Sequence, residues 1–113
     1  WDLHYDANDE SLHSMAEAYT RIYINTCLSN KVEVLLNIMN KGQIDGTIYH
    51  LNRSCKLMSF LNVETAEIIK GVNGKPYVSF DGDQTDPNVF SPAQYETRVQ
   101  ALVEMMEANL AAE

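Results

Sequence analysis

Basic residues are scarce in this chain. Lysine and arginine number 8 among 113 residues, against 16 aspartates and glutamates, so the net charge is -8 at pH 7. A nucleic-acid-binding domain presents a basic patch or stripe to the phosphate backbone. The composition therefore argues against nucleic acid as a partner.

Long hydrophobic runs, a secretion signal and an initiator methionine are missing as well. The apolar runs reach only a few residues, whereas a membrane-spanning helix needs about 20. No basic segment followed by an apolar one opens the sequence. The chain starts directly at Trp1, so we expect it to be a piece of a longer polypeptide.

Cysteine is also rare. Cys27 and Cys55 are too few for the disulfide framework that stabilises small secreted domains. Together with the absence of a membrane span and a signal sequence, this predicts a reducing, cytoplasmic environment.

The periodicity of the apolar residues predicts four helices and two strands. Apolar side chains recur with helical spacing in four segments, and two shorter segments are rich in β-branched and aromatic residues. The expected helices span 11–23, 31–41, 57–69 and 92–110, and the expected strands span 44–51 and 75–80. Gly42 should follow the end of the second helix, and Gly71 and Gly74 should stop the third. Ser91 and Pro92 are typical of the first residues of a helix.

This order of elements predicts an α/β fold. Strands that alternate with helices form parallel sheets covered by helices on both faces. Two strands are too few for a complete sheet of this class. We therefore expect a partial Rossmann-like or flavodoxin-like parallel sheet flanked by helices, with residues 1–113 forming the C-terminal half of a domain.

Cys55 is the first candidate for a functional residue. It follows a predicted strand and precedes a predicted helix, in the polar stretch NRSCK. Ligands in open α/β sheets bind beyond the carboxyl ends of the strands. A helix N-terminus and the neighbours Arg53 and Lys56 favour the thiolate, which is the nucleophilic and metal-binding form of cysteine. A lone cysteine is more often a small buried side chain, but these polar neighbours are not typical of a core.

A single cysteine does not complete a metal site, since zinc and iron–sulfur sites need three or four ligands. Cys55 is therefore either a nucleophile or one ligand of a site whose other ligands lie outside this sequence. Cys27 has no comparable neighbours, and we interpret it as structural.

Three aspartates follow the second strand, at the sheet edge where Cys55 is expected. Asp81 and Asp83 could bind Mg²⁺ or orient a substrate hydroxyl, because carboxylate oxygens suit both tasks. The other interpretation is turn chemistry, since Asp-Gly and Asp-Pro pairs favour turns. We prefer the turn interpretation for Asp86, which precedes a proline, and leave both open for the other two.

Three segments taken together resemble a known family. They are HLNRSCK at 50–56, PYVSFDGDQTDP at 76–87 and YETRVQALVEMME at 95–107. Their order and spacing resemble the 2-hydroxyacyl-CoA dehydratase and benzoyl-CoA reductase family. The similarity covers most of the chain from about Tyr19 onward.

The resemblance implies a subunit of an enzyme that eliminates water from an (R)-2-hydroxyacyl-CoA. Members of the family are paired subunits with Rossmann-like domains, and each subunit typically holds a 4Fe–4S cluster by three cysteines. Cys55 matches the cysteine that the C-terminal domain contributes, while Arg53, Ser54 and Lys56 become candidates for tuning the cluster. A separate ATP-dependent iron–sulfur activator supplies one electron, which leads to a ketyl radical of the thioester and loss of the hydroxyl group. This chain alone should be inactive, because the other ligands and most of the CoA-binding surface lie elsewhere.

Two other functions remain open at this point. The chain could be a non-catalytic flavodoxin-like module in which Cys55 is structural and the helix at 91–110 forms a subunit interface. It could also be an acidic-pocket module of the receiver type, with Asp81 and Asp83 binding Mg²⁺.

Overall fold

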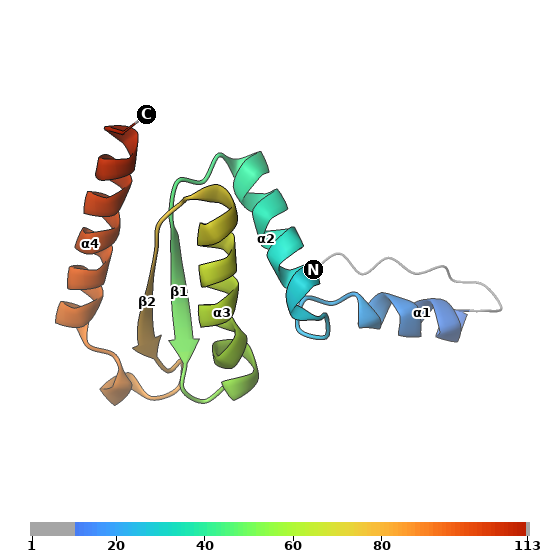
Figure 1. Cartoon of the computed structure of the whole chain (residues 1–113). Helices are drawn as coiled ribbons and strands as arrows, with labels where there is room; N and C mark the ends of the chain where they lie inside the picture. Colours follow the sequence, from blue (N-terminus) through green and yellow to red (C-terminus); the bar gives the residue numbers. More distant parts are fainter. Residues whose placement is uncertain (1–10, 113) are drawn as a thin grey trace.

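The computed structural model describes residues 11–112, and within them the fold is α/β, as predicted (Figure 1). The elements follow in the predicted order, with one additional 3₁₀ turn, η1. They are α1 (Ser11–Thr20), α2 (Leu28–Gly42), β1 (Thr47–Asn52), α3 (Lys56–Asn73), β2 (Tyr77–Gly82), η1 (Pro87–Val89) and α4 (Pro92–Leu110).

The two strands form a parallel sheet, which confirms the prediction. The register pairs Thr47 with Tyr77 at one end and Asn52 with Gly82 at the other. Because the strands are parallel and in step, their carboxyl ends lie at the same edge of the sheet. The segments after β1 and after β2 therefore leave the sheet side by side (Figure 1). This pairing positions the candidate site.

Helices α3 and α4 cover opposite faces of the sheet. Tyr77 donates a hydrogen bond from its hydroxyl to Glu67 of α3 at 2.5 Å. The ring of Phe80 packs against that of Tyr95 in α4, with centroids 5.1 Å apart. Side chains alternate between the faces of a strand, so residues 77 and 80 of β2 point to opposite sides. The arrangement is consistent with part of a flavodoxin-like domain.

The main core cluster lies between helices α2 and α3. Ile69 and Thr65 of α3 are the largest fully buried side chains of the described residues, and Val32 and Met39 of α2 pack against Ile69. The hydroxyl of Thr65 donates to the carbonyl of Leu61 at 2.6 Å, which satisfies its polar atom inside the core. Helix α1 buries none of its residues.

Several element ends differ from the predictions. The first helix ends at Thr20 although the apolar pattern continues to Tyr23. Helix α2 includes Gly42, and Gln43 takes the left-handed conformation with φ 50°. Gly71 lies inside α3, which ends at Asn73; Gly74 caps it with φ 70°, so of the two glycines only Gly74 stops the helix as predicted. A glycine marks a helix end only where the backbone turns left-handed, and no local pattern reveals that turn.

The strands are also shifted along the sequence. β1 starts at Thr47 and not at Ile44, and β2 continues to Gly82 and not only to Phe80. Asp81 therefore belongs to the strand and not to the loop that follows it. The pairing of the two strands determines these limits, because a residue is counted in a sheet only where its backbone finds a partner.

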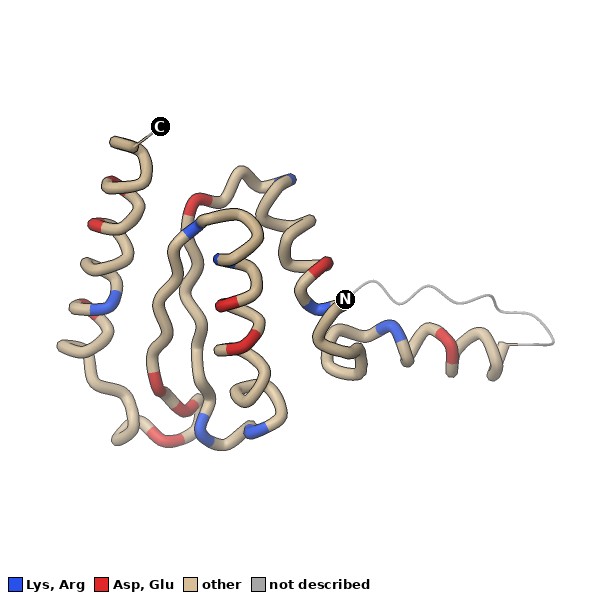
Figure 2. Tube along the Cα trace, viewed as in Figure 1, with Lys and Arg blue, Asp and Glu red and all other residues tan. Residues whose placement is uncertain are grey.

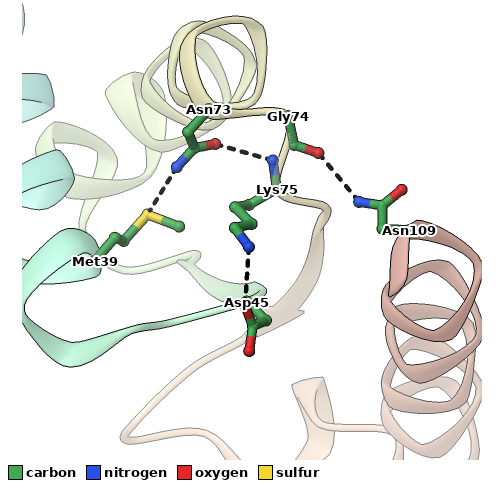
Figure 3. A network of polar contacts seen from close by, with 6 residues as sticks. All are labelled: Met39, Asp45, Asn73, Gly74, Lys75 and Asn109. Atoms are coloured by element: carbon green, nitrogen blue, oxygen red, sulfur yellow. Dashed lines mark hydrogen bonds and ion pairs between the residues drawn. The ribbon is translucent and has the colours of Figure 1, made fainter. Parts of the chain in front are cut away.

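A polar network joins four segments at the amino end of the sheet (Figure 3); one of its contacts runs from the side-chain amide of Asn73 to the sulfur of Met39 in α2, at 3.7 Å. Lys75 forms an ion pair with Asp45 at 2.8 Å, and its backbone N–H donates to the side chain of Asn73 at 3.0 Å. Asn109 of α4 donates to the carbonyl of Gly74 at 3.2 Å. These contacts connect α4 and the start of β1 to the turn between α3 and β2, far from the carboxyl edge.

Within residues 11–112, no helix combines the length and the apolar character that crossing a bilayer would require.

Candidate functional site

Cys55 lies at the carboxyl edge of the sheet, at the N-cap of α3, as the sequence predicts. Its thiol makes no capping hydrogen bond to the helix, and the residue is half-buried. The backbone carbonyl of Cys55 accepts the first helical hydrogen bond, from the N–H of Ser59 at 3.1 Å. The backbone of Cys55 therefore starts the helix, and its side chain is not used to cap it.

The turn before Cys55 is held by hydrogen bonds to Asn52, the last residue of β1. The side-chain oxygen of Asn52 accepts the N–H of Ser54 at 3.0 Å, and its backbone carbonyl accepts the N–H of Cys55 at 3.1 Å. The hydroxyl of Ser59 donates to the same carbonyl at 2.6 Å. These bonds join the end of the strand to the first turn of α3. Neither Asn52 nor Ser59 was expected to have this role from the sequence.

The same turn is joined to the last residues of β2 and to Asp83, which directly follows the strand. The N–H of Arg53 donates to the carbonyl of Gly82 at 3.0 Å, and its guanidinium lies 3.5 Å from the carboxylate of Asp81. The hydroxyl of Ser54 donates to Asp83. Two of the residues flanking Cys55 therefore contact the aspartates that were predicted separately as candidate site residues. Figure 2 shows basic and acidic residues gathered together at this edge.

Asp83 accepts hydrogen bonds on both carboxylate oxygens. One oxygen faces the hydroxyl of Ser54, and the other accepts the N–H and the hydroxyl of Thr85 at 2.9 and 2.8 Å. These hydrogen bonds, led by that of Ser54, hold the pKa of the Asp83 carboxyl well below its usual range. Asp83 is thus a carboxylate whose oxygens already have donors.

A hollow of about 330 Å³ opens between the sheet edge and the start of α3. Lys56 lines it together with Phe60, a residue that is 82% exposed. The remaining lining residues come from the end of β1, the turn, α3 and β2: Leu51, Asn52, Arg53, Ser59 and Asp81. The lining combines apolar side chains with the cation of Lys56, which suits a ligand that has both apolar and anionic parts.

A second hollow of about 260 Å³ lies between the end of β2 and the start of α4. It shares Leu51 and Asp81 with the first, so the two adjoin across the sheet edge. Arg98 provides its basic side chain, and polar groups dominate the remaining lining: Ser79, Phe80, Ser91, Gln94 and Tyr95. None of the α4 residues in this hollow was expected at the site, because contacts between distant segments leave no local pattern.

Aromatic rings pack beside this second hollow. His50 of β1 stacks on Phe80 of β2, with ring centroids 5.0 Å apart, and Phe80 also meets Phe90 and Tyr95 edge-on. The register places His50 directly beside Phe80, which explains the stack. The cluster holds the start of α4 against the end of β2.

Gly82 leaves room for the ring of His50 to stack on Phe80, because it has no side chain. We therefore expect Gly82→Ala to destabilise the chain. A Cβ atom at this position would lie 2.7 Å from Nε2 of His50, whose ring is held by Phe80. Overpacking of this kind costs about 1–3 kcal/mol. Urea unfolding followed by circular dichroism measures the change in the free energy of unfolding.

Gly71→Ala provides the matched control for this prediction. Gly71 lies inside α3, and a Cβ there would meet no atom within 4 Å. Alanine should stabilise the helix at that position by about 0.5–1 kcal/mol. Equal effects of the two substitutions would contradict the proposed close contact at Gly82.

The remaining predicted residues lie in different settings. Asp86 accepts the backbone N–H of Asn88 at 3.0 Å and caps η1, which confirms its turn role. Cys27, interpreted as structural, is exposed at the N-cap of α2. Hydrogen bonds from Ser29 and from the backbone of Asn30 lower the pKa of the Cys27 thiol.

The described residues offer no complete metal site. In residues 11–112, no three histidine, cysteine or acidic side chains gather as metal ligands would. Cys55 provides one uncommitted thiol at the carboxyl edge, and a 4Fe–4S cluster requires further thiolates. The site therefore fits one ligand of a cluster shared with other parts of a longer protein, and does not fit a cluster held by these residues alone.

Comparisons with known proteins agree on one family. The family model of the 2-hydroxyglutaryl-CoA dehydratase D-component matches residues 1–106. Lactoyl-CoA dehydratase subunit alpha of Anaerotignum propionicum is 88% identical over 99% of this chain and 26% of its own length. The (R)-2-hydroxyisocaproyl-CoA dehydratase alpha subunit of Clostridioides difficile is 45% identical over 95% of this chain and 26% of its own length.

The similarity extends to a reductase. One of the subunits of the benzoyl-CoA reductase of Thauera aromatica is 30% identical over 91% of this chain and 24% of its own length. The chain thus spans about a quarter of each of these relatives.

Proposed function

This chain belongs to the family of the 2-hydroxyglutaryl-CoA dehydratase D-component, and from this premise we propose that it is part of the alpha subunit of a 2-hydroxyacyl-CoA dehydratase. The observation that carries the proposal is the 88% identity, over nearly the whole chain, to a protein named lactoyl-CoA dehydratase subunit alpha. The parent enzyme would be a hydro-lyase acting on a short (R)-2-hydroxyacyl-CoA. Residues 1–113 would form the back half of its C-terminal Rossmann-like domain, and would be inactive alone.

We assign Cys55 as one thiolate ligand of a 4Fe–4S cluster whose other ligands lie elsewhere in the parent protein. Its free thiol at the sheet edge supports this assignment. When bound, the cluster supplies the one-electron chemistry that makes the hydroxyl group of the thioester a possible leaving group.

The chain's own residues around Cys55 would orient this ligand and the substrate. Ser54 and Arg53 hold the turn through Asp83 and Asp81. Lys56, which forms no ion pair with any residue of 11–112, lines the hollow beside the turn and could attract an anionic part of the acyl-CoA.

The same family membership supports specific partners. These are a second dehydratase subunit, an ATP-dependent iron–sulfur activator protein and the acyl-CoA substrate. We expect the assembly to work in the cytoplasm, where a reducing environment preserves thiolate ligands.

The test is an anaerobic assay of the full-length parent protein with its second subunit, the activator, ATP and (R)-lactoyl-CoA. We expect the corresponding enoyl-CoA by mass spectrometry, and about four irons with matching sulfide for one cluster per subunit. Omission of the activator should abolish turnover and leave the iron content unchanged. A fully assembled, anaerobic protein that contains no iron and forms no enoyl-CoA would overturn the proposal.

A non-catalytic subunit-interaction module is the second candidate, and exposed apolar residues favour it. Leu57 and Phe60 in the first turns of α3 are 59% and 82% exposed. Exposed apolar side chains of this size often mark protein interfaces. This function predicts a protein without iron whose association with the second subunit is weakened by Phe60→Ala.

A further inference from the structure

Asp83 contacts the turn that precedes Cys55, although the two residues are far apart in the sequence. Its carboxylate contacts Ser54, 29 residues earlier in the chain, across the gap between the two segments that leave the sheet. Two further contacts join the turn to the last residues of β2: the N–H of Arg53 to the carbonyl of Gly82 at 3.0 Å, and Arg53 to Asp81 at 3.5 Å.

These contacts complement those made by Asn52. On the side of β1, the turn is held by the hydrogen bonds that Asn52, the last residue of the strand, accepts from Ser54 and Cys55. On the side of β2, among residues 11–112, the turn is held by the contacts of Arg53 with Asp81 and Gly82 and of Ser54 with Asp83. Ser54 thus contacts both strand ends: its hydroxyl donates to Asp83 after β2, and its backbone N–H donates to Asn52 at the end of β1.

The alternative role for Asp83, as a ligand for Mg²⁺, fits these contacts poorly. A cation needs carboxylate oxygens with free lone pairs facing it. Both oxygens of Asp83 accept hydrogen bonds from Ser54 or Thr85, and the neighbouring Asp81 faces the positive charge of Arg53. The carboxylate of Asp83 is thus occupied by hydrogen-bond donors and that of Asp81 by a cation, all from the protein itself, so they are poorly placed to bind Mg²⁺.

We propose that Asp83 is a positioning residue: by accepting the hydroxyl of Ser54, it ties the turn of residues 52–55 to the end of β2 and holds Cys55 at the N-cap of α3. This inference rests on the proposed function for its purpose, since a held thiolate is what a cluster ligand requires. Residues that orient metal ligands in this way typically change metal affinity about 10–100-fold when they are replaced.

The test measures the reactivity of the Cys55 thiol in the full-length protein after anaerobic removal of iron. The rate of alkylation by iodoacetamide is followed by peptide mass spectrometry, with Cys27 as the internal reference. We expect Ser54→Ala and Asp83→Ala each to raise the ratio of the Cys55 rate to the Cys27 rate at least threefold, because the turn loses the contact of Ser54 with Asp83 and keeps only those of Arg53 with Asp81 and Gly82. Ser54→Thr, which keeps the hydroxyl, should restore the wild-type ratio.

Two comparisons separate positioning from other causes. Asp86→Ala removes the same charge from the same loop, but Asp86 caps η1 and does not contact the turn, so the substitution should leave the ratio unchanged. Ser54→Ala removes the tie without removing charge. An effect of Asp83→Ala alone would therefore mean that charge, and not positioning, controls the thiol, and would overturn the proposal.

The remaining outcomes are equally decisive. Unchanged ratios in both Ser54→Ala and Asp83→Ala would overturn the proposal. If Asp83→Ala does not fold, the pair Ser54→Ala and Ser54→Thr decides alone. The iron content of the wild-type protein tests the proposed function separately, since the alkylation rates are measured without iron.

Discussion

Replacing Cys55 with serine in the full-length parent protein should remove most of its iron and sulfide. Cys55 is the cysteine at the carboxyl edge of the sheet, and its thiol is not used to cap α3. Serine keeps the size and polarity of the side chain but offers a hydroxyl, which is a far poorer ligand for iron than a thiolate. The expected loss is that of the whole cluster, since a 4Fe–4S cluster depends on each of its thiolate ligands.

Anaerobic iron and sulfide analysis, with the visible absorption of the cluster, measures this effect. Cys27→Ser is the matched control, because Cys27 is exposed at the N-cap of α2, outside the candidate site. It should keep about the wild-type iron content. If the Cys55→Ser protein is folded and retains its iron, Cys55 is not a cluster ligand, and a structural role for it gains support.

The second large effect is expected at Ile69. Ile69→Ala should lower the free energy of unfolding of the chain by about 2–5 kcal/mol, the range for truncating a buried isoleucine. Its side chain is only 2% exposed and packs against Val32 and Met39 of α2. Truncation would leave a cavity between α2 and α3, because α3 also packs against β1 and cannot shift freely to fill the space.

Ile68→Ala is the control, since it makes the same chemical change one residue earlier in the same helix. Ile68 is 38% exposed, so we expect a loss of about 1 kcal/mol or less. Urea unfolding of both variants under identical conditions gives the comparison. Similar losses of unfolding free energy at both positions would contradict the prediction, because they would mean that the burial of Ile69 does not determine the cost of its truncation.

The two predictions address different properties of α3. Its first residue follows the candidate ligand, and its middle residues form the core. The buried residues Thr65, Ala66 and Ile69 fix the helix against the sheet and α2. Because the helix is held there, its N-terminus and Cys55 have a defined place relative to the strand ends. The stability of the chain and the position of the Cys55 thiol therefore both depend on α3.

Local sequence patterns were enough for much of the fold. Apolar spacing revealed all four α-helices, β-branched and aromatic residues revealed both strands, and the alternation of the two predicted the parallel pairing. The placement of Cys55 between β1 and α3 followed from the same patterns. These features depend on residues within a few positions of one another, which is the range that periodicity reports.

The limits of the elements and the contacts of the site depended on tertiary structure. Gln43, and not Gly42, adopts the left-handed turn after α2, because the chain must reverse there towards β1. The contact of Ser54 with Asp83 spans 29 residues, and that of His50 with Phe80 spans the sheet. Such contacts exist only after the parallel strands have paired, because pairing brings their carboxyl ends to one edge. The position of Cys55 as a candidate functional residue was thus readable from nearby residues, whereas the groups that hold it in place were determined by the pairing of distant ones.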